Sequence, residues 1–266
     1  MKRKAVLSLL AVLTLTVGVA FGGCGATNGE VEGAVTESTA EAETNAHTVT
    51  LYDVDGTTVL DTVEVPEGEA LNVADPIKDG YTFEGWFVSA DMNRRYDATK
   101  NVTKDMDLYA GFSSYQEDER SFYIVGSGES ELMAASNWGA DFGDAYAMTK
   151  SEKTDVNEYT LTVDLQEGDQ FQLVASSSWE DQRGFGYLDT DSLDGSFYFK
   201  SASGLGDASP KKTNIEVLKS GTYTFTLTTH PAEDYYDTED EYYTEETKEN
   251  FNLNPYDTIS WTYEAN

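Results

Sequence analysis

Cysteine and histidine are scarce in this chain of 266 residues, which contains one Cys and two His. A single cysteine excludes an internal disulfide, so the fold must rely on a hydrophobic core. The two histidines, His47 and His230, leave little for a His-based metal site or a catalytic triad. The sequence therefore predicts no metal site and no cofactor.

Basic residues are also few, because 17 Lys and Arg accompany 49 Asp and Glu and give a net charge of −32. A polyanion of this strength is repelled by nucleic acid phosphates and by anionic lipid headgroups. A neutral ligand, or a cationic one, suffers no such repulsion. We therefore expect no nucleic acid partner.

Proline is rare at 5 residues, whereas the chain has 22 Gly and 17 Tyr, together with many Thr. This composition favours strands and turns over helices. With 39% hydrophobic and 12% aromatic residues the chain is too rich in core-forming side chains to be wholly disordered. The sequence also lacks a nucleophile elbow, a phosphate loop and a run of metal ligands. We therefore predict a mainly β protein that is not an enzyme.

Residues 1–23 have the pattern of a secretion signal. Basic residues at 2–4 precede an apolar run at 5–21, which is short for a membrane-spanning helix. Two glycines stand directly before Cys24, and small residues before a lone cysteine resemble the bacterial lipobox. This resemblance implies cleavage before Cys24, a lipid on its sulfur, and an outward-facing protein anchored to the bacterial cell membrane. The alternative is an ordinary signal peptide with a chance cysteine.

Residues 24–46 are small, polar or acidic. Such a segment buries too little apolar surface to offset its ordering entropy, and its glutamates repel one another. We predict a lipidated, disordered acidic tether that holds the folded part away from the membrane.

Residues 47–115 contain the first folded module. Residues 48–54 alternate at strand period, Asp55 and Gly56 form a hairpin turn signal, and residues 57–65 predict a second strand. The segment Gly-Tyr-Thr-Phe-Glu-Gly-Trp-Phe at 80–87, with the later Asp-Met-Asp-Leu-Tyr-Ala, resembles the internalin-type B repeat, or Listeria–Bacteroides repeat. The resemblance implies a small β-grasp-like module that acts as a spacer or contacts proteins. Trp86 is expected in its core.

Residues 116–266 contain several short alternating segments separated by turn signals, namely 121–128, 157–165, 170–175, 222–228 and 258–263. This pattern predicts a β-sandwich of the immunoglobulin-like kind. No amphipathic helix of useful length is apparent. Trp261 is in phase with Ile259 and Tyr263, which predicts a core position.

Trp138 and Trp179 differ from the other two tryptophans because they lie in polar, loop-like surroundings. An exposed Trp on a loop is a candidate binding residue, and packing against the sandwich edge is the alternative. The strand 170–175 places Phe171 and Leu173 inward and Gln172 outward by parity.

The order of these features resembles starch-binding β-sandwich modules. The resemblance implies a carbohydrate-binding module in which Trp138 and Trp179 form an aromatic cradle for glucose rings, while Gln172 hydrogen-bonds a sugar hydroxyl. Gln182, Arg183 and Tyr187 are further candidates for hydroxyl contacts. The implied ligand is an α-glucan polysaccharide or a maltooligosaccharide, and the implied partners are surface amylases or uptake proteins.

Other interpretations remain open. The protein is an adhesin-like surface protein if the repeat module binds a protein partner, or a substrate-capture accessory to an uptake system. Residues 189–195 resemble a calcium loop in part, but Lys200 stands where the bidentate Glu belongs. Residues 232–250 hold nine acids and four Tyr, and we expect a long solvated loop. A second sugar-contacting surface and calcium binding are the alternatives there.

Overall fold

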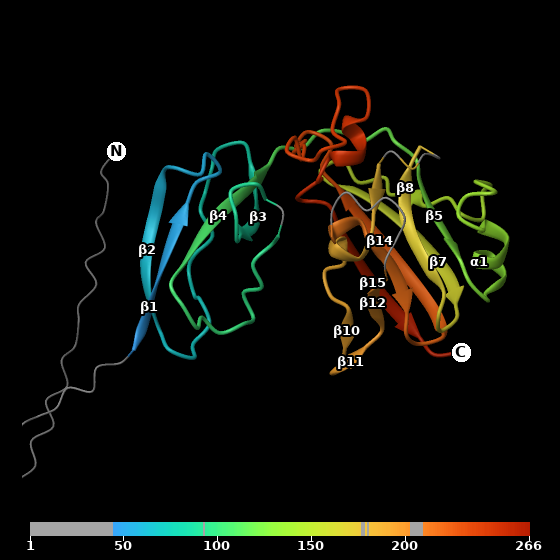
Figure 1. Cartoon of the computed structure of the whole chain (residues 1–266), viewed down its shortest axis with the longest axis horizontal. Helices are drawn as coiled ribbons and strands as arrows, with labels where there is room; N and C mark the ends of the chain where they lie inside the picture. The colour runs from blue at the N-terminus through green and yellow to red at the C-terminus, as the bar shows by residue number, and fades with distance from the viewer. Residues whose placement is uncertain (1–44, 93, 177–178, 180, 203–209) are drawn as a thin grey trace, which may run out of the picture. The chain divides into compact units, whose positions relative to one another are not determined.

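The computed structural model describes residues 45–266, apart from residues 93, 177–178, 180 and 203–209 (Figure 1). Residues 44–266 form one compact unit. The predicted signal peptide, Cys24 and nearly all of the predicted tether lie outside the described residues. Within the described residues no helix is long and apolar enough to cross a membrane.

A four-stranded mixed sheet forms the first part of the described chain. Its strands are β1 (Ala46–Tyr52), β2 (Val59–Pro66), β3 (Thr82–Phe87) and β4 (Met106–Ser113), in the order β2-β1-β4-β3. β1 and β4 run parallel, whereas the outer pairs are antiparallel. A sheet with a parallel central pair and hairpin connections agrees with the predicted β-grasp-like module.

The turn between β1 and β2 forms where the sequence predicts it. Gly56 has a φ of +69°, which costs glycine little because it has no Cβ. The Asp55 carboxylate accepts hydrogen bonds from the backbone N–H groups of Thr57 and Thr58, at 2.8 and 2.7 Å. These bonds fix the loop that returns the chain antiparallel to β1.

One face of this sheet carries its core. Val49, Leu108 and Ala110 are fully buried there. Trp86 is 8% exposed, and its ring meets the ring of Phe83 at 5.3 Å in an edge-on arrangement. The prediction that Trp86 is a core residue is confirmed.

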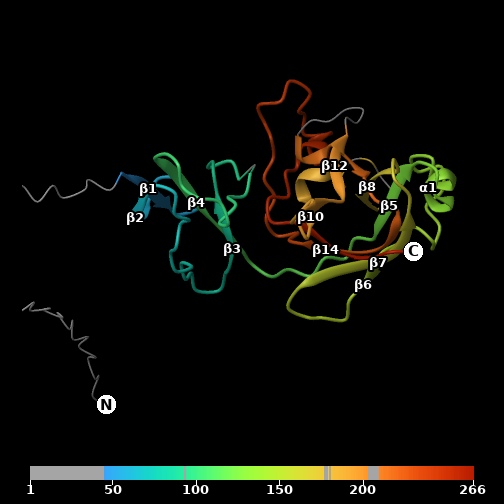
Figure 2. The ribbon, with the colours of Figure 1, turned by 90° about the horizontal axis from the view of Figure 1, so that it is seen from below.

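Two further sheets pack face to face in the second part of the chain (Figures 1 and 2). One consists of β5 (Phe122–Ser127), β8 (Gln170–Ala175), β9 (Gln182–Arg183), β12 (Phe199–Ala202) and β13 (Asn214–Val217). The other consists of β6 (Thr149–Lys150), β7 (Asn157–Leu165), β14 (Gly221–Thr229) and β15 (Thr258–Glu264). The predicted β-sandwich is confirmed.

The alternation of apolar and polar residues explains how these sheets meet. On β14, Tyr223, Phe225 and Leu227 are fully buried, while the threonines between them are partly exposed. Phe225 contacts Phe171 of the facing sheet, with ring centroids 5.1 Å apart. Burying a side chain of this size contributes about 1.5–3 kcal/mol, so a few such contacts hold the sheets together.

Trp261 on β15 packs against this core, as its phase with Ile259 predicts. Its indole stands edge-on to Phe199 at 5.0 Å and donates a hydrogen bond to the carbonyl of Thr190 at 2.7 Å. The side chain is only partly buried, because β15 is an edge strand of its sheet.

Helices are short throughout the described residues. They are α1 (Glu131–Ser136) and the 3-10 turns η1 (Phe185–Tyr187), η2 (Pro210–Lys212) and η3 (Lys248–Phe251). A small hairpin of β10 (Ser192–Leu193) and β11 (Ser196–Phe197) covers part of the segment considered as a calcium loop.

The acidic segment 232–250 connects β14 to β15. Its ends are fastened by backbone hydrogen bonds, from Asp237 N–H to the Phe251 carbonyl at 2.9 Å and from Leu253 N–H to the Tyr235 carbonyl at 2.7 Å. Most of its acidic side chains face solvent.

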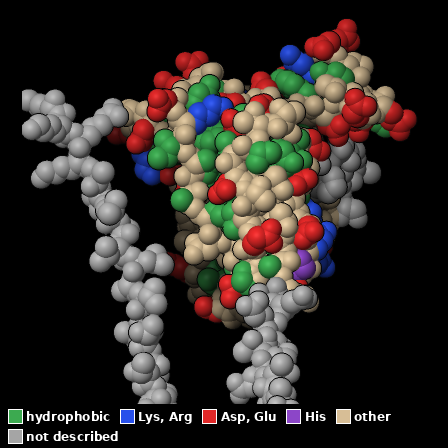
Figure 3. All heavy atoms as spheres, turned by 90° about the vertical axis from the view of Figure 1, so that its left-hand side faces the viewer, with side chains coloured by type: hydrophobic (Ala, Val, Ile, Leu, Met, Phe, Trp, Pro, Cys, Tyr) green, Lys and Arg blue, Asp and Glu red, His purple; other side chains and the backbone are tan. Residues whose placement is uncertain are grey.

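The face of the molecule in Figure 3 carries more acidic than basic side chains, with apolar side chains between them. Exposed apolar residues of the first sheet and of the loop before β3 are Val59, Leu60, Ile77 and Tyr81. Ile77, at 94% exposed, is the most accessible of these.

Candidate functional site

The loop that carries Trp138 has an unusual backbone. α1 is capped at its start by Ser130 and ends at Asn137, where φ is +37°. The left-handed conformation continues through Trp138 at +60° and Gly139 at +87°. A bulky residue with positive φ is strained, and such strain persists only where the surroundings enforce it. Here the Trp138 N–H donates to the Gly126 carbonyl at 2.7 Å, which fixes the loop against β5.

Trp179 lies on the loop between β8 and β9, and its side chain is 36% exposed. The Gln182 side-chain amide donates a hydrogen bond to the Trp179 carbonyl at 2.9 Å. The base of the loop is closed by a bond from Ala175 N–H to the Asp181 carbonyl, also at 2.9 Å. These two hydrogen bonds therefore hold the backbone of the loop that carries the exposed indole.

The two loop tryptophans meet. Their ring centroids are 6.0 Å apart and their planes are inclined by 50°. Gly139 leaves room for Phe142, because a Cβ there would lie 2.9 Å from the Phe142 ring, whereas its 3.6 Å distance to the Trp179 indole nitrogen would be an ordinary contact. The arrangement is a bent aromatic surface formed by two partly exposed indoles.

Phe142 is a neighbour of this surface that the sequence reasoning did not select. Its ring is partly buried and stands edge-on to Tyr123 of β5, with centroids 5.7 Å apart and planes at 89°. An aromatic residue so soon after Trp138, in a segment otherwise made of small and acidic residues, is the signal that could have revealed it.

Gln172 does not lie where parity predicts a solvent-facing side chain. It is 2% exposed, and its amide nitrogen donates to the Lys212 carbonyl and to the Asn214 side chain, both at 2.7 Å. The prediction that Gln172 faces outward into solvent is wrong, because η2 and the start of β13 cover this face of β8. Parity identifies a side chain's face but not what lies over that face.

The prediction that Arg183 and Tyr187 contact sugar hydroxyls fails for the same reason, because both side chains are buried. Arg183 is fully buried, with its guanidinium bound to Asp181 and Asp257. Tyr187 is 2% exposed, and its hydroxyl donates to the Leu253 carbonyl at 2.7 Å. Neither side chain can hydrogen-bond a sugar beside the indole pair, since the polar groups of both are committed to internal partners. Gln182 alone of the polar candidates stays partly exposed beside Trp179.

A chain of buried charges supports the Trp179 loop. The Asp181 carboxylate accepts hydrogen bonds from Arg120 at 2.7 Å, from Arg183, and from the Asn254 amide at 3.1 Å. Arg183 in turn donates through Nε to Asp257 at 2.7 Å. Removing one partner from such a set would leave a buried charge unpaired, which is strongly unfavourable.

The chain of charges continues to His230. Asp257 Oδ1 accepts the His230 backbone N–H at 2.8 Å, and His230 Nε2 lies 3.3 Å from Glu84 Oε1 on β3. Burial disfavours the charged imidazole, but Asp257 and Glu84 outweigh burial and raise the pKa of His230 to about 9. The imidazole is therefore a cation at neutral pH.

The described residues contain no group of three or more His, Cys, Asp or Glu side chains placed to hold a metal ion. The chemistry that the bent surface offers is apolar stacking, with amide groups at its edge. A mixed-sheet module followed by a β-sandwich with a paired tryptophan surface defines the class of this protein.

Comparison with known proteins bears on the first module. Residues 47–111 match the family model of the Listeria-Bacteroides repeat domain. The resemblance of this segment to that repeat is thereby confirmed. No curated protein matches the chain.

Among solved structures, the chain is similar to SusF from Bacteroides thetaiotaomicron, with 12% sequence identity and a TM-score of 0.36. The match covers 73% of this chain and 35% of SusF, so the chain spans about a third of that structure.

Proposed function

We propose that this protein binds starch or a related α-glucan without catalysis, through Trp138 and Trp179. The observation that carries the proposal is the bent indole pair, with centroids 6.0 Å apart and planes inclined by 50°. The strained φ of +60° at Trp138 supports it, because strain at an exposed aromatic residue is typical of functional sites.

The chemistry of a glucan suits this surface. One face of a glucose ring is a patch of C–H groups, for which an indole offers a large and rigid apolar contact. An α-1,4 chain curves, so two inclined rings match successive sugars better than a flat surface would. Gln182 beside Trp179 supplies an amide that donates and accepts hydrogen bonds at the sugar edge. The ligand is neutral, so the acidity of the chain does not oppose it.

Titration of the mature protein with maltoheptaose tests the proposal. We expect a dissociation constant on the order of 10⁻⁴ M, which corresponds to about −5.5 kcal/mol. Trp138→Ala and Trp179→Ala should each weaken binding by roughly 1–3 kcal/mol, the range for stacking of a planar base on an aromatic side chain. Unchanged affinity in both variants would contradict glucan binding by stacking on the two indoles.

Two matched controls separate binding from folding. Phe197 is 62% exposed on β11, so Phe197→Ala should leave maltoheptaose affinity unchanged. Trp261 packs against the sandwich core, so Trp261→Ala should lower the free energy of unfolding by about 3 kcal/mol. In thermal melts Trp138→Ala, Trp179→Ala and Phe197→Ala should keep nearly the melting temperature of the unmodified protein, whereas Trp261→Ala should melt at a lower temperature.

We further propose that the protein is a surface lipoprotein held by a lipid on Cys24, with the repeat module as a spacer. Surface amylases or uptake proteins are the partners that this arrangement suits. A protein-binding role of the repeat is the second candidate, favoured by Ile77 at 94% and Tyr81 at 46% exposure. Ile77→Asp should abolish adhesion but not glucan binding if the second candidate holds, and the Trp variants should do the reverse.

A further inference from the structure

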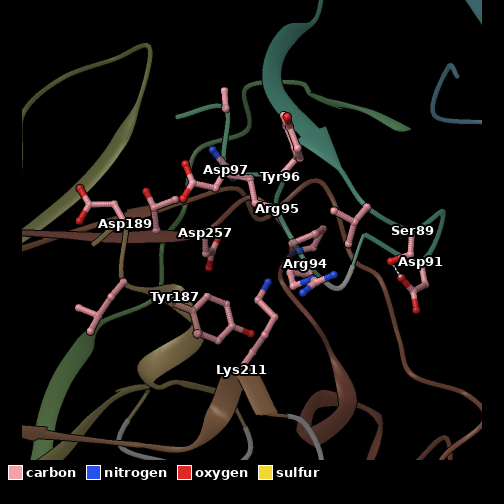
Figure 4. A pocket seen from close by; sticks show the side chains of 16 residues that line it. Ser89, Asp91, Arg94, Arg95, Tyr96, Asp97, Tyr187, Asp189, Lys211 and Asp257 are labelled. Atoms are coloured by element: carbon pink, nitrogen blue, oxygen red, sulfur yellow. Dashed lines mark hydrogen bonds between the residues drawn. The ribbon is translucent and has the colours of Figure 1, made fainter. Parts of the chain in front are cut away.

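A cleft of about 840 Å³ lies away from the indole pair (Figure 4). One wall is the loop after β3, with Arg94, Arg95 and Tyr96, and the other is formed by η1, η2 and the start of β15, with Tyr187 and Lys211. Sequence analysis singled out none of these residues except Tyr187. The cleft has the size of a site for a small molecule.

Arg94 and Arg95 of this cleft differ from the other arginines of the described chain in having no close ion pair with a carboxylate. Arg120 pairs with Asp118 and Asp181, and Arg183 is also held by two carboxylates. Among the described residues, neither Arg94 nor Arg95 has a carboxylate within 4.0 Å, and Arg95 is attracted by Glu84 only at longer range. In a chain with 49 acidic and 17 basic residues, two adjacent arginines without a close ion pair are unexpected.

Lys211 supplies a further donor, from the opposite wall of the cleft. Its Nζ lies 3.3 Å from the Leu253 carbonyl and 4.5 Å from the centroid of the Tyr187 ring. Figure 4 shows Lys211 extending beside Tyr187 toward the loop of Arg94 and Arg95. Tyr96 belongs to the wall only, because its ring packs against the core of the first sheet and its hydroxyl is buried.

The surroundings of Lys211 also favour an anion in the cleft. Burial is the main cause that lowers the pKa of Lys211, to about 7, and nearby cations add to the effect against the opposing influence of Asp257. The titratable and charged groups facing Lys211 are Tyr187 on η1, Asp257 before β15, Arg95 on the loop after β3, Arg183 on β9 and Lys212 on η2. An anion in the cleft would relieve the repulsion among these cations.

Carboxylates also line the cleft, namely Asp91, Asp97, Asp189 and Asp257. Asp97 pairs with Lys100 at 3.3 Å, and Asp257 pairs with Arg183 at 2.7 Å, so both charges are compensated. Burial raises the pKa of Asp189, which disfavours its charged form. The more distant acids of the chain are screened beyond about 8 Å at physiological ionic strength.

We propose that this cleft binds one oxyanion group of a small ligand, a carboxylate or a phosphate, through Arg94, Arg95 and Lys211. Guanidinium groups suit such ligands because their planar donors match two oxygens at once. The ammonium of Lys211 adds a point charge from the opposite wall, and the proposal is independent of the glucan site.

Titration of the mature protein with three probes at pH 6 tests this proposal. The probes are D-galacturonate, inorganic phosphate and D-galactose, where galactose has the shape of galacturonate without its charge. We expect saturable binding of galacturonate or of phosphate, and the stronger of the two identifies the source of the oxyanion. Galactose should bind at least tenfold more weakly than galacturonate. Absence of saturable binding of both anions, or equal binding of the two sugars, would overturn the proposal.

Variants locate the site. Arg94→Gln and Arg95→Gln should each weaken anion binding by about tenfold or more, the loss expected for a hydrogen bond to a charged group. Lys100→Gln is the matched control, since Lys100 is on the same loop but pairs with Asp97, and it should change binding less than about twofold. Lys100→Gln with the larger loss would contradict the assignment.

The dependence on pH gives a second measurement, which holds even where an arginine variant is poorly folded. Raising the pH from 6 to 8 removes the proton of Lys211, so galacturonate, whose carboxylate keeps the same charge over this range, should bind the unmodified protein several-fold more weakly across pH 7. Lys211→Met should bind more weakly at pH 6 and lose this dependence. An unchanged pH profile in Lys211→Met would exclude Lys211 from the site.

Discussion

At Trp138 the backbone conformation disfavours a large side chain, whereas the proposed binding surface requires one. Its φ of +60° is a conformation that glycine adopts freely and that costs other residues roughly 1–2 kcal/mol. A chain selected for stability alone would place glycine at this position, as it does at the adjacent Gly139. The contact with Trp179 accounts for a large aromatic side chain there, and the proposed glucan on the shared surface would add a second reason.

This conflict predicts that binding and stability separate at position 138. The free energy of unfolding of Trp138→Gly should exceed that of Trp138→Ala by about 1 kcal/mol, because glycine relieves the left-handed strain that alanine retains. The Gly variant should therefore unfold at a higher urea concentration. Both variants should lose maltoheptaose binding equally. Urea unfolding followed by circular dichroism measures the difference, and an Ala variant as stable as the Gly variant would show that the loop is not strained.

Some residues of the candidate site could be predicted from the sequence, and others could not. Trp138 and Trp179 could be selected because an indole among polar loop residues has few local partners, and the structure brings the two together. Gln172, Arg183 and Tyr187 could not be excluded as ligand contacts, because the segments that bury them are distant in sequence. Arg183, for example, depends on Asp257, which lies 74 residues further along the chain.

At the scale of elements, the chain of buried charges ties β3, β9 and the segment before β15 together. It alternates in sign along Glu84, His230, Asp257, Arg183, Asp181, Arg120 and Asp118. Because Asp181 follows Trp179 by two residues, the same contacts that compensate the buried charges also anchor the Trp179 loop.

His230 makes the stability of this arrangement depend on pH. Its pKa is raised from 6.5 to about 9 by Asp257 and Glu84 against the effect of burial, so the folded state binds the proton more tightly than the unfolded state. The resulting stability is fully present below pH 6.5 and is lost as the pH rises through 9. Over the same window Lys211 and Lys212, whose pKa values burial lowers to about 7 and about 8, contribute stability that rises with pH, so the contribution of His230 is measured as a difference. The gap in melting temperature between the mature protein and His230→Gln should narrow from pH 6.5 to pH 9, and a gap that stays constant over this window would contradict the role of His230.

The longer strands were predictable because alternation is a local property. β7, β8, β14 and β15 match segments whose apolar residues recur at every second position, and each is buried on the expected face. β12 and β13 were not predicted, since four residues carry too little alternation to be recognised. They become strands because β13 pairs with β8 and β12 with β13, which is a property of the assembled sheet.

At the scale of the whole molecule, the signal at residues 1–23 and Cys24 predict how the protein is held. Cys24→Ala removes the sulfur to which a diacylglycerol would be attached, so the variant should appear in the medium or remain unprocessed. Cell fractionation with an antibody to the folded part measures the distribution. Equal retention of the variant in the membrane fraction would contradict lipid anchoring at Cys24.

The net charge of −32 provides a test that distinguishes the two proposed sites. Maltoheptaose is neutral, so its affinity should change less than about twofold between 0.1 M and 1 M NaCl. Galacturonate or phosphate in the cleft of Arg94, Arg95 and Lys211 should bind several-fold more weakly at the higher salt concentration.

The direction of the salt effect on anions follows from distance. The Debye length falls from about 10 Å at 0.1 M to about 3 Å at 1 M. Repulsion by distant acids is already screened at 0.1 M, so added salt mainly weakens the short-range attraction of the cleft and supplies chloride as a competitor. Arg95→Gln should reduce this salt dependence because it removes one of the attracting cations. Anion binding that strengthens with salt would mean that the overall negative charge, and not the cleft, dominates the interaction.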